Sequence, residues 1–347
     1  MKQILYFVKK QVSRFLMLAA CGLTYTSCDS ILDEEYTDEE CAWEYRIKFK
    51  YDYNMKYADA FAREVKSVTL YAFDEDDNFV YQKTEQGDVL KDKDYEMVVE
   101  LQAGDYHFVT WAGLENEESF SVPLMTPGES TLDDLTCRMN RETITRADDG
   151  SALIKDSLKY LFHGEVESAS FSRGLNREQT VTIPLVKNTN SIIIMLQQYA
   201  EGLDVSNFEF MITDDNGLMN YDNTLLEDET LKYIPWETKT YDVIESEEES
   251  TINHISTVRA KMTVGRLIAA KHPKLTINNR LTGETVLSIP LTDCLLLAKP
   301  DATMGDQEYL DRQDIYNMIF FLDDDMKWMN AEININGWVV RYNQMGF

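Results

Sequence analysis

The residue types that most often carry out enzyme chemistry are few and scattered in this sequence of 347 residues. Four histidines lie in unrelated segments, at His107, His163, His254 and His272. No HExxH pair, GxSxG nucleophile elbow, Walker loop or dinucleotide-binding GxGxxG pattern occurs. Carboxylates are abundant, but the sequence alone locates no Asp/Glu pair of the kind that glycosidases use. We therefore expect no catalytic residue, no metal site and no cofactor, and we interpret the chain as non-enzymatic.

Two Asp-rich stretches, Asp74–Asn78 and Asp214–Gly217, contain the residue types that bind calcium. Both lack the twelve-residue loop with a terminal Glu that an EF-hand requires. Asp and Asn side chains also accept hydrogen bonds from the backbone of tight turns, which explains their presence between strands without a metal. We interpret both stretches as hairpin turns.

The five cysteines predict neither a disulfide framework nor a zinc site, because their number is odd and no CxxC or CxxH pair occurs. Cys41, Cys137 and Cys294 are widely spaced, and we interpret the last two as buried small hydrophobic residues. Cys21 and Cys28 lie at the end of a basic and then apolar segment. That segment is too short to span a bilayer, so residues 1–27 are predicted to be a signal peptide.

Cys21 and Cys28 compete as the cysteine that becomes a lipidated N-terminus, as in bacterial lipoproteins. Cys21 follows LAA, the better local match, whereas Cys28 follows TS and gives an apolar region of more usual length. Cys28 is also followed by an acidic run that resembles the segment directing Bacteroidetes lipoproteins to the outer cell surface. We predict lipidation of Cys28, with Cys21 as the competing candidate, and an acidic tether over residues 28–42. The alternative is a simple secretory signal with Cys28 as an ordinary thiol.

Length and composition indicate a folded protein of two domains. Hydrophobic residues make up 44% of the chain, which contains only 7 Pro and 15 Gly, so a disordered protein is not expected. The formal net charge of −28 repels nucleic acid and disfavours electrostatic binding to anionic lipid.

Alternating aromatic and β-branched residues predict strands throughout, most clearly over Leu101–Gly113 (LQAGDYHFVTWAG). Gly104 predicts a reversal there, with Tyr95–Leu101 pairing antiparallel to Tyr106–Ala112. Other strands are expected over Trp43–Asp52, Lys66–Phe73, Asn78–Thr84, Leu158–Glu165, Gln179–Val186, Ser191–Leu196, Asn207–Thr213, Ser256–Thr263, Lys274–Asn278, Thr285–Pro290, Met318–Leu322 and Glu332–Tyr342. Frequent short strands with turns between them favour an all-β fold of two β-sandwiches, over residues 43–187 and 188–347.

Several ordered stretches resemble one known family. They are LQAGDYHFVTWAG, TVTIPLVKNTNSIII, the C-terminal INGWVVR, the early IKFKYDYNMKYADAFAREVKSVTLYAFD, and YLDRQDIY before the strand MIFFL. Together they make the chain similar to the FimB-type fimbrial anchor lipoproteins of Bacteroidales. The resemblance implies two tandem transthyretin-like β-sandwich domains, a lipidated N-terminal cysteine at Cys28, and a position at the base of a fimbria on the outer membrane. It implies two partners, the fimbrial shaft subunits and the outer-membrane lipid that holds the acyl chains.

Head-to-tail contacts that do not close build a filament, and a subunit fixed to lipid ends that series. We therefore hypothesise that the chain accepts or offers one strand, which anchors the shaft and limits its length. The C-terminal stretch Ile333–Val340 is dense in β-formers, but an ordinary internal strand is the simpler explanation for it. The alternative function is a surface adhesin or glycan-binding lipoprotein with the same anchor.

Overall fold

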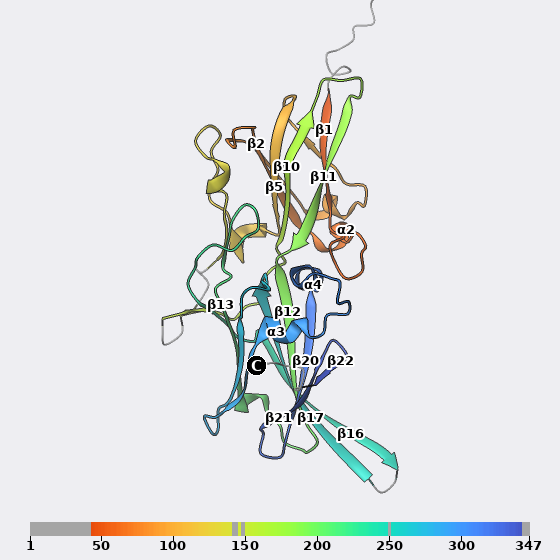
Figure 1. Ribbon diagram of the computed structural model, residues 1–347, viewed down its shortest axis with the longest axis vertical. Helices are drawn as coiled ribbons and strands as arrows, with labels where there is room; N and C mark the ends of the chain where they lie inside the picture. Colours follow the sequence, from red (N-terminus) through yellow and green to blue (C-terminus); the bar gives the residue numbers. More distant parts are fainter. Residues whose placement is uncertain (1–42, 141–144, 147–149, 249–250, 342–347) are drawn as a thin grey trace, which may run out of the picture. The chain divides into compact units, whose positions relative to one another are not determined.

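The computed structural model describes residues 43–140, 145–146, 150–248 and 251–341, and residues from Tyr45 onward form one compact unit. The described residues contain 22 strands and only short helices, so the predicted all-β fold class is confirmed (Figure 1). The α-helices are α2 (Phe61–Glu64), α3 (Leu291–Leu296) and α4 (Asp306–Arg312). Short 3-10 helices span Gly87–Lys91, Glu115–Glu117, Leu132–Asp134 and Val205–Asn207.

A seven-stranded sheet is built from the first half of the chain. Its spatial order is β3 (Phe79–Gln86), β2 (Ser67–Phe73), β5 (Gly104–Ala112), β10 (Phe162–Phe171), β11 (Glu178–Lys187), β1 (Glu44–Lys50) and β4 (Met97–Val99). Ile47 and Phe49 of β1 share one buried core with Val68 and Leu70 of β2, although several strands separate β1 from β2 in the sheet. The sheet therefore folds over on itself and encloses this core as a sandwich does.

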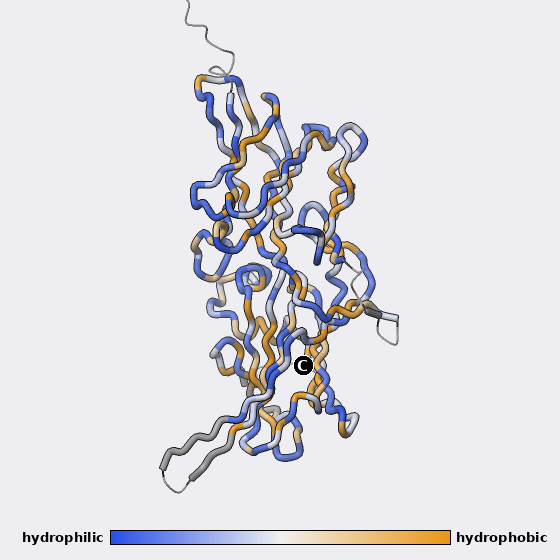
Figure 2. The backbone as a smooth tube through the Cα atoms, turned by 180° about the vertical axis from the view of Figure 1, so that it is seen from behind, coloured by the Kyte–Doolittle hydropathy of each residue, from blue (hydrophilic) through white to orange (hydrophobic). Residues whose placement is uncertain are grey.

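Strand β5 is central in this sheet, and its alternation decides which core each side chain enters. Phe108 packs into the core just described, whereas Val109 and Trp111 point to the opposite face and join a second core. Every residue of the neighbouring β2 is buried, as expected for a strand covered on both faces. The same alternation of hydrophobic and hydrophilic residues is visible along many strands in Figure 2.

A small three-stranded sheet contributes to that second core. Its order is β14 (Leu218–Met219), β7 (Cys137–Met139) and β6 (Phe120–Ser121). Phe120, Cys137 and Met219 are fully buried in the same cluster as Trp111. The predicted buried state of Cys137 is therefore confirmed, and Cys294 on α3 is buried in the same cluster.

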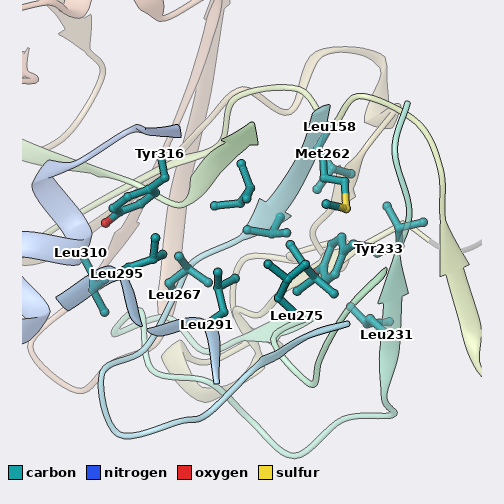
Figure 3. Close-up of a cluster of buried hydrophobic side chains, with 14 of the residues drawn as sticks. Leu158, Leu231, Tyr233, Met262, Leu267, Leu275, Leu291, Leu295, Leu310 and Tyr316 are labelled. Atoms are coloured by element: carbon teal, nitrogen blue, oxygen red, sulfur yellow. The ribbon is translucent and has the colours of Figure 1, made fainter. Parts of the chain in front are cut away.

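Two six-stranded sheets use the second half of the chain. One has the order β16 (Glu237–Glu248), β17 (Thr251–Gly265), β12 (Thr189–Gln198), β20 (Ile315–Leu322), β21 (Trp328–Ile335) and β22 (Trp338–Arg341). The other has the order β19 (Thr285–Pro290), β18 (Lys274–Asn279), β13 (Phe208–Asp214), β15 (Leu231–Tyr233), β9 (Ala152–Ile154) and β8 (Thr145–Arg146). Side chains from both sheets and from α3 and α4 fill one core, part of which is drawn in Figure 3.

Strand pairing crosses the position where the sequence suggested a domain boundary. Strand β9 pairs parallel with β15, and β7 pairs antiparallel with β14, so two sheets combine strands from before residue 187 with strands from after residue 188. The division into domains of residues 43–187 and 188–347 stays a prediction, as does the transthyretin-like topology.

The expected hairpin between Tyr95–Leu101 and Tyr106–Ala112 is wrong. Strand β4 pairs with β1, where Met97 lies opposite Ile47, while β5 lies between β2 and β10. Met97 and Val99 thereby enter the sandwich core from the far end of the sheet. Alternation along a strand predicts which side chains are buried but not which strand lies beside it, so the pairing could not be inferred from proximity along the chain.

The single strand expected over Glu332–Tyr342 is also wrong, because this stretch turns back on itself. Strands β21 and β22 form a hairpin in which Ile335 lies opposite Trp338. The two turn residues, Asn336 and Gly337, have φ angles of 52° and 87°. An Asn-Gly pair with both φ angles positive forms the turn whose twist matches that of the flanking strands. Tyr342 lies outside the described residues.

Candidate functional site

The predicted lipidation site lies outside the described residues. Cys28, the competing Cys21, the signal peptide and the whole acidic tether precede residue 43, so the anchor remains a prediction. None of the helices in the described ranges is long and apolar enough to cross a membrane. Burial raises the pKa of the Cys137 thiol above its ordinary range, and burial raises that of Cys294 to about 12. Neither thiol is therefore a reactive group at neutral pH.

The C-terminal hairpin offers a free strand edge. Strand β22 is the last strand of its sheet and pairs, among the described residues, only with β21. Trp338 is 58% exposed and Val339 is 55% exposed. Ile335 and Trp338 flank the two-residue turn as the hydrogen-bonded pair, so the next residue, Val339, directs its N–H and C=O away from β21. Within residues 43–341 as described, this edge has an unpaired donor and acceptor beside apolar side chains.

Two other edge strands, β3 and β16, carry more charge than β22. On β3, Lys83 lies 3.3 Å from Glu85, and on β16 the carboxylate of Glu237 is surrounded by basic groups, including Lys239 at 3.4 Å. Charges on edge strands oppose pairing with another chain. By this criterion β22 is better suited to strand addition than β3 or β16.

A buried lysine connects residues from three distant parts of the chain. The Lys187 ammonium at the end of β11 lies 3.1 Å from Glu64 and 3.5 Å from Asp314, and 3.6 Å from the centre of the Tyr160 ring. Tyr51 donates to Asp314 at 2.9 Å. We call these five residues the Lys187 cluster. The lysine side chain is only 5% exposed, so the two carboxylates must compensate its charge.

Two carboxyl groups in the Lys187 cluster titrate differently. Burial alone would raise the pKa of Glu64, but the Lys187 ammonium holds it below its usual value. Burial raises the pKa of Asp314 above its usual range, although Lys187 opposes that shift. The cluster joins the end of β1, α2 and the start of β20, and it contains no group placed to act on a substrate.

A cleft of about 790 Å³ lies beside the Lys187 cluster. One wall contains the segment from Asn54 to Glu64, including α2, and another contains Arg312–Ile315. The Arg312 guanidinium lies 3.9 Å from the centre of the Tyr53 ring. The aromatic side chains and cations that line this cleft are spread over the whole sequence, so no local motif could have revealed it.

The structure does not bring the four histidines together. His107 lies 2.8 Å from Glu165. Burial lowers the pKa of His107, but the contact with Glu165 raises it by more, so the pKa is above its ordinary value. His163 is buried beside Trp111, and burial lowers its pKa to about 4. His272 lies 3.1 Å from Asp293, and His254 is in β17. Within the described ranges, no group of three or more His, Cys, Asp or Glu side chains is arranged to hold a metal ion.

The first Asp-rich stretch is the predicted hairpin turn, because β2 pairs with β3. The prediction is wrong for Asp214–Gly217, because β13 pairs with β15 and β18 whereas β14 pairs with β7. Asp74 accepts backbone hydrogen bonds from Asp76 at 3.0 Å and from Asn78 at 2.9 Å, as an Asx turn does. Asp214 instead ends β13 and is buried, and burial raises its pKa to about 7. Sequence alone could not distinguish these two aspartates, because the difference comes from tertiary packing around Asp214.

Comparison with known proteins identifies the family. The sequence profile of the fimbrillin-A associated anchor proteins Mfa1 and Mfa2 matches residues 37–344. The chain belongs to this family of fimbrial anchor proteins. The resemblance to fimbrial anchors drawn from the sequence is therefore confirmed, and the family is not one of enzymes. No curated protein matches the sequence.

Solved structures agree with this assignment. A Bacteroides thetaiotaomicron protein described as a candidate adhesin is 35% identical, with a TM-score of 0.77, 87% of this chain covered and 99% of that one. A second protein of that species, described as a candidate polysaccharide-binding protein, is 32% identical with a TM-score of 0.73, covering 88% of this chain and 100% of that one. The fimbrial anchor protein Mfa2 of Porphyromonas gingivalis shares the fold at 17% identity, with a TM-score of 0.62 and coverage of 86% and 98%. The chain thus has a fimbria-associated anchor or adhesin role.

Proposed function

We propose that this protein anchors a fimbria to the outer membrane through lipid on Cys28 and binds a shaft subunit by strand addition at β22. The observation that supports this most strongly is the match of residues 37–344 to a family of fimbrial anchor proteins. The free edge at Val339 supplies a surface suited to the contact. Fixing one subunit in lipid ends the filament at that point and limits its length.

The strand contact follows from the chemistry of an unpaired edge. An added strand gains affinity from main-chain hydrogen bonds, and alternate side chains set its register. The N–H and C=O of Val339 are available for such bonds, and the exposed Trp338 and Val339 side chains add apolar area. The contact forms once, because a subunit held in lipid offers the shaft only one end.

The membrane contact follows from the N-terminal sequence. One acyl chain binds a membrane only marginally, whereas several chains on one cysteine hold it stably. Cys28 is the proposed acceptor because it directly precedes the acidic run, and Cys21 is the alternative. The acidic residues 29–40 keep the folded part away from an anionic lipid surface by charge repulsion.

The anchor is tested in native cells that produce an epitope-tagged copy of the full chain. Three forms are compared by membrane fractionation and pull-down: wild type, Cys28→Ala and Cys21→Ala. The proposal predicts that wild type and Cys21→Ala stay in the membrane fraction and bring down fimbrial subunits, whereas Cys28→Ala releases them to the medium. Release by Cys21→Ala alone would move the anchor to Cys21, and a wild type that brings down no fimbrial subunit would contradict the anchor role.

A surface adhesin is the second candidate function. It is favoured by the 35% identical Bacteroides thetaiotaomicron protein described as a candidate adhesin. An adhesin of this kind would bind a host or glycan surface even when no fimbrial subunit is present. Surface binding by cells that lack the shaft subunits distinguishes the two roles.

A further inference from the structure

We propose that the Lys187 cluster is a modification site, at which the folded chain forms an amide bond between Lys187 Nζ and Asp314 Cγ with loss of water. The Lys187 ammonium lies 3.5 Å from the Asp314 carboxylate and 3.1 Å from that of Glu64. Reacting groups held about 3–3.5 Å apart are already in a near-attack arrangement. The bond is a separate feature from lipid on Cys28 and from strand addition at β22.

The surroundings of Lys187 hold its amine against the carboxyl group. The lysine side chain is only 5% exposed. The centres of the Tyr160 and Phe162 rings lie 3.6 Å and 5.7 Å from its Nζ. Well-oriented groups within one molecule react as if present at about 10⁵–10⁸ M. This proximity favours a condensation that is unfavourable between a free amine and a free carboxylic acid in water.

The two carboxyl groups of the cluster are suited to different roles in this reaction. Burial raises the pKa of Asp314, which favours the protonated acid whose hydroxyl can leave as water. Burial also acts on Glu64, but Lys187 and Arg63 outweigh it and hold the pKa of Glu64 below its usual value. Glu64 therefore stays ionised and can accept a proton. Neighbouring carboxyl groups whose environments separate their pKa values act as an acid and a base.

Tyr51 is placed to stabilise the negative charge that develops on Asp314. Its hydroxyl donates to Oδ1 of Asp314 at 2.9 Å and lies 3.0 Å from Oδ2. The Tyr51 side chain is buried, and burial raises its pKa, so the hydroxyl remains a donor at neutral pH. A fixed donor on a carboxyl oxygen acts as an oxyanion hole when a nucleophile attacks the carbon.

The reaction begins from the ion pairs seen in the structure. Glu64 takes one proton from the Lys187 ammonium, and the neutral Nζ attacks Cγ of protonated Asp314. Glu64 returns that proton to the hydroxyl that leaves as water, and then takes the second proton from the nitrogen and passes it to solvent. One N–C bond forms, one C–O bond breaks, and no oxidant or other reactant is consumed.

The bond connects two sheets of the protein. Lys187 is the last residue of β11 in the seven-stranded sheet, and Asp314 directly precedes β20 in the sheet that ends at β22. The chain continues from β11 into β12, which lies beside β20 and pairs parallel with it (Figure 1). A filament that pulls on β22 would load the connection between these sheets, so this use of the bond rests on the proposed function, whereas its formation does not.

The test is mass spectrometry of a tryptic digest of the purified full chain. Trypsin does not cleave after an acylated lysine, so the bond predicts residues 178–232 joined to residues 313–327, one water lighter than the two separate peptides. Lys159 and Glu118 provide an internal control in the same digest. Their charged groups lie 3.2 Å apart, but both side chains are about half exposed, so they should remain unlinked.

Two variants separate the covalent bond from the ion pair. Lys187→Arg keeps the positive charge, but a guanidinium does not form this amide, so the linked peptide should be absent. Glu64→Gln removes the proton acceptor and should slow linking by about 100-fold or more, measured as the linked fraction at intervals after synthesis. Circular dichroism checks that both variants fold.

Three outcomes would overturn the proposal. They are only unlinked peptides from the folded wild-type chain, linking at an unchanged rate in Glu64→Gln, or Lys187 linked to Glu64 in place of Asp314. The wild-type digest decides the first of these whether or not the variants fold. None of these outcomes bears on Cys28 or β22, so the anchor proposal stands or falls separately.

Discussion

Replacing Lys187 with Met should destabilise the fold strongly, because it removes the one cation between two partly buried carboxylates. Glu64 and Asp314 are only 18% and 23% exposed, and after the change Arg63 would still pair with Glu64 but no cation would pair with Asp314 among the described residues. Breaking a buried ion pair from one side costs about 3–5 kcal/mol. The residual exposure of both carboxylates favours the lower end, about 3 kcal/mol, which lowers Tm by about 6 °C in a chain of this size.

The measurement is thermal unfolding followed by circular dichroism, with Lys159→Met as the matched control. Lys159 lies 3.2 Å from Glu118, but both side chains are about half exposed, so the control should lose less than about 1 kcal/mol. Adding Asp314→Asn to Lys187→Met should restore part of the loss, because it removes the uncompensated charge. A Lys187→Met variant that unfolds at the same temperature as Lys159→Met would refute the reasoning.

Three further predictions concern stability. Glu165 raises the pKa of His107 in the folded state, so protonated His107 stabilises the fold below its unfolded pKa, and this stabilisation is lost as pH rises. His107→Gln should therefore lower the free energy of unfolding more at pH 5.5 than at pH 8.5, as measured by urea unfolding. Burial raises the pKa of Asp214 to about 7, so the folded state favours the protonated carboxyl and is destabilised as pH rises from about 4 to 7. Asp214→Asn should therefore raise the free energy of unfolding at pH 8 and change it little at pH 4. An equal effect at both pH values would contradict this. A Cβ on Gly164 would lie 2.7 Å from the Pro184 carbonyl oxygen, so Gly164→Ala should cost about 1–3 kcal/mol by denaturant unfolding, whereas Gly174→Ala, with its nearest atom at 3.7 Å, should cost far less.

Individual strands could be predicted from the sequence because their signal is local. The alternation in β1 and β5 gave both the strand and the side chains that enter a core, as with Ile47 and Phe108. Partner choice was not local. Strand β4 pairs with β1 across about fifty residues, and nothing in the local pattern of Tyr95–Leu101 indicates that partner rather than the adjacent β5.

The C-terminal hairpin could have been predicted, since Asn336-Gly337 between alternating apolar residues is the strongest short signal for a hairpin. The Lys187 cluster could not, because Tyr51, Lys187 and Asp314 are far apart in sequence and no spacing relates them. The cleft has the same origin. In the sequence its lysines and arginines look like ordinary surface residues, and only the tertiary structure shows which of them are buried or paired with carboxylates.

The most direct test of the anchor account is whether strand addition at β22 holds the fimbria. Val339→Pro removes the outward N–H and leaves the ladder to β21 intact, and Val339→Thr keeps that N–H as the matched control. The measurement is the amount of fimbrial shaft subunit recovered with the tagged, membrane-bound full chain. Attachment through β22 predicts wild-type recovery with Val339→Thr and a loss of about tenfold or more with Val339→Pro. Equal recovery with both variants would contradict attachment through this edge.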